Sequence, residues 1–117
     1  MKIESENDVK KKVVLPWFKI RNAWSFAPVQ TGLGTAGIPD RVGCVPVRIT
    51  QDMVGQTFGL FVAVECKRPG RRGEKDRGLT KNQVNILNEI NAAEGVSFVC
   101  DGEEDLRNAG ERWPWLI

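Results

Sequence analysis

The stretch Phe58–Lys67, FGLFVAVECK, sets the fold class of this 117-residue chain. Its residue types favour a β-strand, in which successive side chains point to opposite faces. One face carries Phe61, Ala63, Glu65 and Lys67, and the other carries Leu60, Val62, Val64 and Cys66. Both faces are apolar until the last residues, which predicts a central strand that is covered on two sides and gathers its charges at one end.

Helix and strand patterns flank this stretch on both sides. In chain order they are a helix over about Ser5–Ile20, strands over Ala23–Ala27 and Arg41–Thr50, a turn over Gln51–Thr57, the central strand, a helix over Thr80–Glu94, a strand over Val96–Cys100 and a short helix over Glu103–Ala109. Pro16 should end or kink the first helix early, and Pro46 marks an edge position or a bulge. The order predicts one α/β domain over residues 1–117, with a small mixed sheet flanked by helices in the order α-β-β-β-α-β.

The composition excludes several kinds of chemistry. The chain has no His and no Tyr, which removes Ser-His and Cys-His nucleophile pairs, imidazole zinc sites and covalent tyrosine chemistry. Cys44, Cys66 and Cys100 are far apart, so we expect small buried apolar residues and no disulfide framework. No apolar run approaches the ~20 residues of a membrane span and the start lacks a secretory pattern, so we expect a cytoplasmic protein without a membrane partner.

A glycine-rich stretch, GLGTAG over residues 32–37, has the G-x-G-x-x-G spacing of a dinucleotide-binding loop. Such a loop must open a helix whose N-terminus faces the phosphates. Here Ile38, Pro39 and a β-patterned segment follow instead. The stretch therefore predicts a sharp turn ahead of Asp40 and no nucleotide cofactor.

Two carboxylates and a lysine are expected to meet at the end of the central strand. If the turn near Asp52–Gly55 closes a hairpin, Asp40 lies roughly opposite Lys67 and diagonal to Glu65. Carboxylates held close need a neutralising cation, and oxygen ligands suit Mg²⁺ or Mn²⁺. The backbone carbonyl of Cys66 would be a further ligand. On spacing alone, an ordinary Asp–Lys–Glu surface cluster is the alternative.

Three motifs in this order resemble those of a known family. They are G-I-P-D-R at 37–41, V-E-C-K-R-P-G at 64–70 and L-T-K-N-Q at 79–83. Together they resemble the PD-(D/E)XK nuclease superfamily and, within it, the virus-type replication-repair nuclease domain (VRR-NUC) in its stand-alone phage and bacterial form. The resemblance runs from about Gly37 to Leu87 and implies a restriction-endonuclease-like core.

The resemblance also implies roles for single residues. Asp40 and Glu65 would be metal ligands, Lys67 the catalytic lysine and Gln83 the glutamine that opens the following helix. The acid of the first helix fits Glu6 best, with Glu4 left open. For Gln83 a second interpretation stands beside this one, because Thr80-x-x-Gln83 is also the pattern of a helix capping box.

The segment Lys67–Arg77, KRPGRRGEKDR, carries six basic and two acidic side chains, a local +4 that leaves −2 for the rest of a chain whose net charge is +2. This asymmetry indicates either a polyanion contact or a solvated loop. The candidate phosphate contacts are Arg68, Arg71, Arg72, Lys75 and Arg77.

The reaction implied is metal-dependent hydrolysis of DNA phosphodiesters in a bacterial or phage-infected cell. The expected substrate is Holliday-junction-like or other branched DNA, cut by a homodimer. Trp113, Trp115, Leu116 and Ile117 form an apolar tail that either joins the dimer interface or packs on its own core. A non-catalytic module that binds branched DNA and a sequence-specific nuclease are the alternatives.

Overall fold

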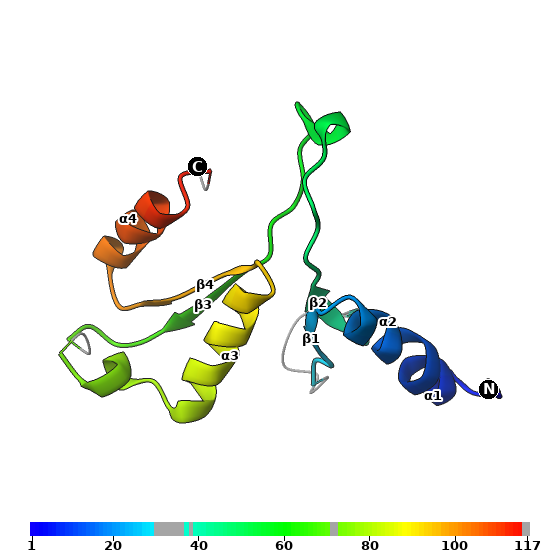
Figure 1. Cartoon of the computed structure of the whole chain (residues 1–117). Helices are drawn as coiled ribbons and strands as arrows, with labels where there is room; N and C mark the ends of the chain where they lie inside the picture. The colour runs from blue at the N-terminus through cyan, green and yellow to red at the C-terminus, as the bar shows by residue number, and fades with distance from the viewer. Residues whose placement is uncertain (30–36, 38, 71–72, 116–117) are drawn as a thin grey trace. The chain divides into compact units, whose positions relative to one another are not determined.

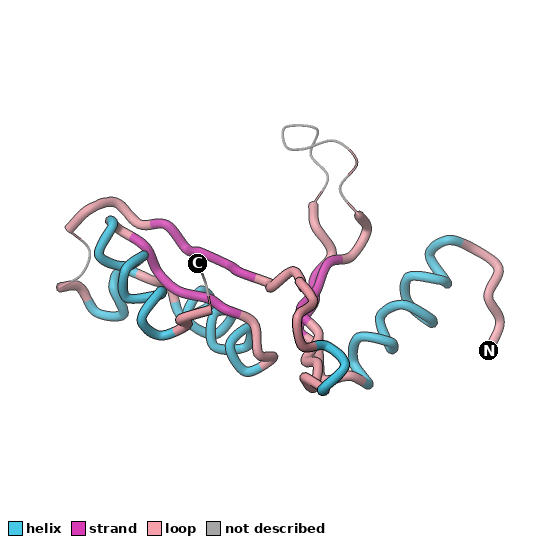
Figure 2. The backbone as a smooth tube through the Cα atoms, turned by 90° about the horizontal axis from the view of Figure 1, so that it is seen from above, coloured by secondary structure: helices cyan, strands magenta, loops and turns pink. Residues whose placement is uncertain are grey.

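The computed structural model describes residues 1–29, 37, 39–70 and 73–115. The chain divides into two compact units, Met1–Thr57 and Phe58–Ile117, and each is described by itself (Figures 1 and 2). Helices and strands occur in both units, so the α/β class is confirmed. The prediction that the two units make one nuclease domain stays a prediction.

The first unit begins with a helix that continues past its proline. It consists of α1 (Glu6–Asp8), the π-helix η1 (Val9–Val14) and α2 (Leu15–Ile20). Pro16 therefore does not end the helix early, and the alternative expectation, a kink at Pro16, stays a prediction. Proline lacks an N–H, and its ring collides with the carbonyl four residues back. The wider π turn, in which the Leu15 N–H donates to the Lys10 carbonyl, gives that ring room, so the helix continues.

Two short strands follow in this unit. β1 (Trp24–Phe26) pairs antiparallel with β2 (Val42–Cys44), and Trp24 lies opposite Cys44. β2 is shorter than the predicted strand over Arg41–Thr50, because it ends at Cys44, ahead of Pro46, which has no N–H to donate to a partner strand. The predicted turn after it contains the 3₁₀-helix η2 (Gln51–Met53).

The second unit is built on a parallel strand pair with a helical crossover. β3 (Val62–Cys66) pairs with β4 (Val96–Cys100), and α3 (Lys81–Ala92) connects them and packs against both (Figure 1). The 3₁₀-helix η3 (Lys75–Gly78) precedes α3, and α4 (Glu103–Arg112) packs on β4. The buried core includes Ile90, Ala93, Val96, Val99 and Ala109.

Within the described residues each unit has one strand pair, antiparallel β1–β2 in the first unit and parallel β3–β4 in the second, and the single mixed sheet that would join them stays a prediction. β3 is not covered on two sides, because Val62 and Val64 are each 43% exposed and only β4 pairs with it among the described residues. Cys44 is buried as expected, but the Cys66 side chain is exposed. The predicted hairpin that would bring Asp40 to Lys67 spans both units and stays a prediction.

Candidate active site

Three polar side chains of the second unit form one hydrogen-bonded chain. Glu65 and Lys67 leave the same face at the end of β3, and Gln83 lies in the first turn of α3. Gln83 Nε2 donates to Glu65 Oε1 over 2.9 Å, and Lys67 Nζ donates to Gln83 Oε1 over 3.1 Å. All three residues are half-buried. Gln83 thus points back from α3 toward the end of β3.

Gln83 is also one half of the capping box that its spacing predicts. Its Oε1 accepts the Thr80 backbone N–H over 2.9 Å, while Thr80 Oγ1 accepts the Gln83 N–H over 3.1 Å. The capping-box interpretation of Gln83 is therefore confirmed, and its role as the glutamine of the resembling family stays a prediction. The cap fixes the side chain by the oxygen that receives the Lys67 ammonium, so the helix start and the polar chain share one anchor.

Backbone pairing continues past the last residue of β3. The Lys67 N–H donates to the Cys100 carbonyl over 2.9 Å. This bond holds the backbone from which the Lys67 side chain departs, so the lysine starts from an ordered position. The role of the Cys66 carbonyl as a metal ligand stays a prediction.

The remaining candidate acids lie in the first unit. Glu6, at the start of α1, and Asp40, just before β2, line one cavity of about 330 Å³. Lys10 lines it too, and its Nζ lies 3.7 Å from Asp40 Oδ1. Glu4 pairs instead with Lys2 over 3.0 Å. Of the two first-helix acids that the sequence leaves open, Glu6 is the one that lines a cavity with Asp40.

The candidate ligands fit Mg²⁺ or Mn²⁺ in their chemistry, since carboxylate and carbonyl oxygens are the donors these ions prefer. Within the described residues, no three His, Cys, Asp or Glu side chains gather in a group that could hold a metal ion. Glu6 and Asp40 belong to one unit and Glu65 to the other. That Asp40 and Glu65 bind one ion stays a prediction.

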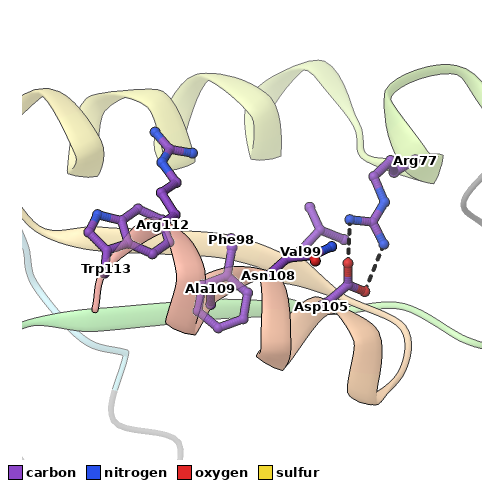
Figure 3. A pocket seen from close by; sticks show the side chains of 8 residues that line it. All are labelled: Arg77, Phe98, Val99, Asp105, Asn108, Ala109, Arg112 and Trp113. Carbon is purple, nitrogen blue, oxygen red and sulfur yellow. Dashed lines mark hydrogen bonds and ion pairs between the residues drawn. The ribbon is translucent and has the colours of Figure 1, made fainter. Parts of the chain in front are cut away.

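Arg77 is a candidate phosphate contact by its sequence position, but the structure gives its guanidinium two carboxylate partners (Figure 3). Its Nη1 and Nη2 donate to Asp105 Oδ1 and Oδ2 over 2.9 and 2.8 Å, and Nη2 lies 3.4 Å from Asp101 Oδ1. Asp105 is 4% exposed, and these hydrogen bonds hold its pKa far below the ordinary value. Arg77 therefore anchors the basic segment to α4, and its guanidinium is engaged by the carboxylates of its own unit rather than presented to a phosphate.

The backbone of this segment supports the same conclusion. Asp76 and Arg77 have φ values of 51° and 55°, a left-handed conformation that costs L-residues roughly 1–2 kcal/mol each. Arg77, one of these two residues, also makes the ion pair with Asp105. Among the other candidate phosphate contacts, Arg68 and Lys75 are exposed, and Arg71 and Arg72 lie outside the described residues.

The described residues of the apolar tail differ in their exposure to solvent. Trp113 is half-buried, and its ring centroid lies 6.2 Å from that of Phe98 in β4, so this residue packs on its own unit. Trp115 is 64% exposed, and Leu116 and Ile117 lie outside the described residues.

Sequence reasoning missed Asp105, whose acidic position at a helix start fits a dipole interaction and gives no sign of an arginine partner.

Comparisons of the chain with protein-family models, with curated proteins and with solved structures find no match. In the described part of the chain, none of the helices has the length and apolar character needed to cross a membrane.

Proposed function

We propose that this protein is a divalent-metal-dependent DNA endonuclease of the PD-(D/E)XK type, selective for Holliday-junction-like or other branched DNA. The observation that carries the proposal is the Glu65–Gln83–Lys67 chain at the end of β3. In this chain the Glu65 carboxylate and the Lys67 ammonium both bond to the side-chain amide of Gln83, and all three residues belong to the sequence motifs. Glu6 and Asp40, which line one cavity of the first unit, are the other two acids that the proposal requires.

Each residue has a distinct task in this proposal. Asp40, Glu65 and the Cys66 carbonyl would hold Mg²⁺ or Mn²⁺, which when bound supplies Lewis-acid activation of the phosphodiester. Lys67 orients the attacking water and stabilises negative charge that develops on the phosphate oxygens. Gln83 keeps Glu65 and Lys67 at fixed separation, and Glu6 supports the Asp40 side of the site.

The exposed basic residues of the Lys67–Arg77 segment would contact DNA phosphates. Such contacts position the backbone and read no sequence, which favours selection by DNA structure. Arg68 and Lys75 are the described candidates, and Arg71 and Arg72 remain candidates from the sequence.

A homodimer is part of the proposal, because cutting both strands of a junction needs two sites and one chain supplies one. The exposed ring of Trp115 is the described part of the tail that a partner chain could cover. We expect sedimentation equilibrium to give a dimer at micromolar concentration. A monomer under those conditions would contradict the dimer.

The test is cleavage of a labelled four-way junction with Mg²⁺ or Mn²⁺, beside linear duplex, a flap and single-stranded DNA. Asp40→Asn and Lys67→Ala should each abolish junction cutting while leaving the fold intact by circular dichroism. Lys19→Ala, which changes an exposed lysine in the last turn of α2, is the matched control and should cut as the wild type does.

Two outcomes would replace the proposal with its alternatives. Junction binding without cutting in either metal would indicate a non-catalytic module. A fixed cut position on linear duplex would indicate a sequence-specific nuclease.

A further inference from the structure

A second polar and aromatic site lies in the same unit, between β4 and α4. It is a cavity of about 170 Å³ whose lining includes Phe98, Trp113, Asn108 and Arg112 (Figure 3). None of these four side chains takes part in the Glu65–Gln83–Lys67 chain. The volume is below the ~300–1,000 Å³ of pockets that enclose drug-sized ligands, so the cavity suits one planar ring.

The aromatic side chains give the cavity a surface for stacking. The rings of Phe98 and Trp113 are tilted by 35° with centroids 6.2 Å apart. The Arg112 guanidinium carbon lies 4.5 Å from the centre of the Trp113 ring. Aromatic rings and arginine guanidinium planes are the groups on which proteins stack unpaired bases.

The polar groups at the cavity favour an anionic ligand that also forms hydrogen bonds. The Arg77 charge is matched by the Asp105 carboxylate, whereas within the described residues no ion pair holds Arg112. Arg112 therefore supplies the net positive charge of the lining. The carboxamide of Asn108 offers both donors and an acceptor, as recognition of a base edge requires.

We propose that this cavity binds the base of an unpaired nucleotide, with Arg112 directed to its phosphate. That the nucleotide belongs to DNA rests on the proposed function; the ligand chemistry, a planar base next to a phosphate, does not. The protein would then prefer substrates with unpaired nucleotides, such as the open centre of a branch or a single-stranded flap.

The test is binding of the full-length protein in EDTA to three fluorescein-labelled probes: oligothymidylate of eight nucleotides, an abasic oligonucleotide of equal length, and an eight-base-pair duplex. The abasic strand keeps the phosphates and lacks the bases. We expect oligothymidylate to bind about tenfold or more tightly than the abasic strand, in line with a stacked base. Equal affinity of these two strands would overturn the proposal.

Variants assign the binding to this cavity. Trp113→Ala and Arg112→Ala should remove the preference for bases, whereas Trp113→Phe, which keeps a stacking ring, should retain most of it. Arg107→Ala is the matched control on α4 and should behave as the wild type. If both Trp113→Ala and Arg112→Ala retain the preference for bases, the assignment to this cavity is refuted. If Trp113→Phe loses the preference as Trp113→Ala does, the loss in Trp113→Ala reflects misfolding and not the missing stacking ring.

Competition with thymidine 5′-monophosphate distinguishes the two sources of the ligand. If the free nucleotide displaces the labelled strand at a concentration equal to that at which the strand itself binds, the cavity remains a nucleotide site. The proposal that its ligand is part of DNA would then be overturned. The binding assay contains EDTA and needs no metal, so a failure of the protein to cleave DNA does not affect its result. If the protein cleaves DNA but shows no preference for bases, the cavity proposal is rejected and the proposed function is not.

Discussion

Gln83 serves the helix and the polar chain with one amide, and substitutions can separate the two roles. Gln83→Glu keeps the acceptor that the Thr80 N–H needs, because glutamate is a usual partner in a capping box. It replaces the donor to Glu65 with a second carboxylate, so like charges meet there. We expect junction cleavage lowered at least about tenfold, together with some loss of thermal stability, since a hydrogen bond to a charged group contributes ~1.5–3 kcal/mol to folding.

Thr80→Ala is the converse variant. It removes the hydroxyl that accepts the Gln83 N–H and should cost about 1 kcal/mol of folding free energy, with cleavage largely kept. Thermal unfolding and cleavage rates, measured for both variants, show whether the capping role and the proposed catalytic role of Gln83 are separate. If Gln83→Glu cuts at the wild-type rate, Gln83 is only a cap.

Asp105 makes the stability of the second unit depend on pH. Arg77 lowers its folded-state pKa below the ordinary 3.8, so the unfolded chain binds the proton more readily. The stabilisation is complete above about pH 5 and is lost as pH falls through 3.8 toward the depressed folded value. Asp105→Asn should lose about 1–3 kcal/mol at pH 7 and show a flatter profile between about pH 5 and 2. Thermal unfolding across that range, with exposed Glu111→Gln as control, measures both effects.

At the scale of elements, the packing of α2 on the β1–β2 pair depends on Gly43. A Cβ at this position would lie 2.7 Å from the Phe18 ring and 2.8 Å from both the Ser25 Cβ and the Trp24 carbonyl oxygen. Two of these neighbours belong to the paired strand, so relief requires the backbone to shift. Overpacking of this kind costs about 1–3 kcal/mol.

Gly43→Ala should therefore destabilise the first unit by that amount in urea unfolding. Gly59→Ala is the matched control, because nothing lies within 4 Å of the Cβ that alanine would add there and the φ of Gly59 is not positive. A Gly43→Ala protein as stable as the Gly59→Ala protein would contradict the close packing of α2 on this strand pair.

Local patterns predicted the elements well, and the exceptions have physical causes. Alternation in Phe58–Lys67 placed Glu65 and Lys67 on one face, and Thr80-x-x-Gln83 placed the amide at the helix start. The π-helix was missed because a local rule treats Pro16 as a break, whereas widening one turn accommodates its ring.

Local sequence patterns do not predict contacts between residues that are far apart in the sequence. Arg77 and Asp105 lie 28 positions apart, and they meet only because α4 packs on β4. The parallel pairing of β3 with β4 likewise joins segments far apart in the sequence, with α3 as the crossover between them.

At the scale of the whole molecule, the proposed site needs one acid from each unit, and a double-mutant cycle on metal affinity tests this directly. If Asp40 and Glu65 bind the same ion, Asp40→Asn and Glu65→Gln should each remove most Mn²⁺ affinity, and the double variant should lose little more. The summed single losses would then exceed the double loss by about 1 kcal/mol or more.

Isothermal titration calorimetry with Mn²⁺ measures the four affinities, and Asp52→Asn, an exposed acid in η2, is the control that should leave binding unchanged. Losses that add within ~0.5 kcal/mol would mean that the two carboxylates act independently. The Glu65–Gln83–Lys67 chain would then be a structural feature of the second unit, and the cavity of Glu6 and Asp40 would need another explanation.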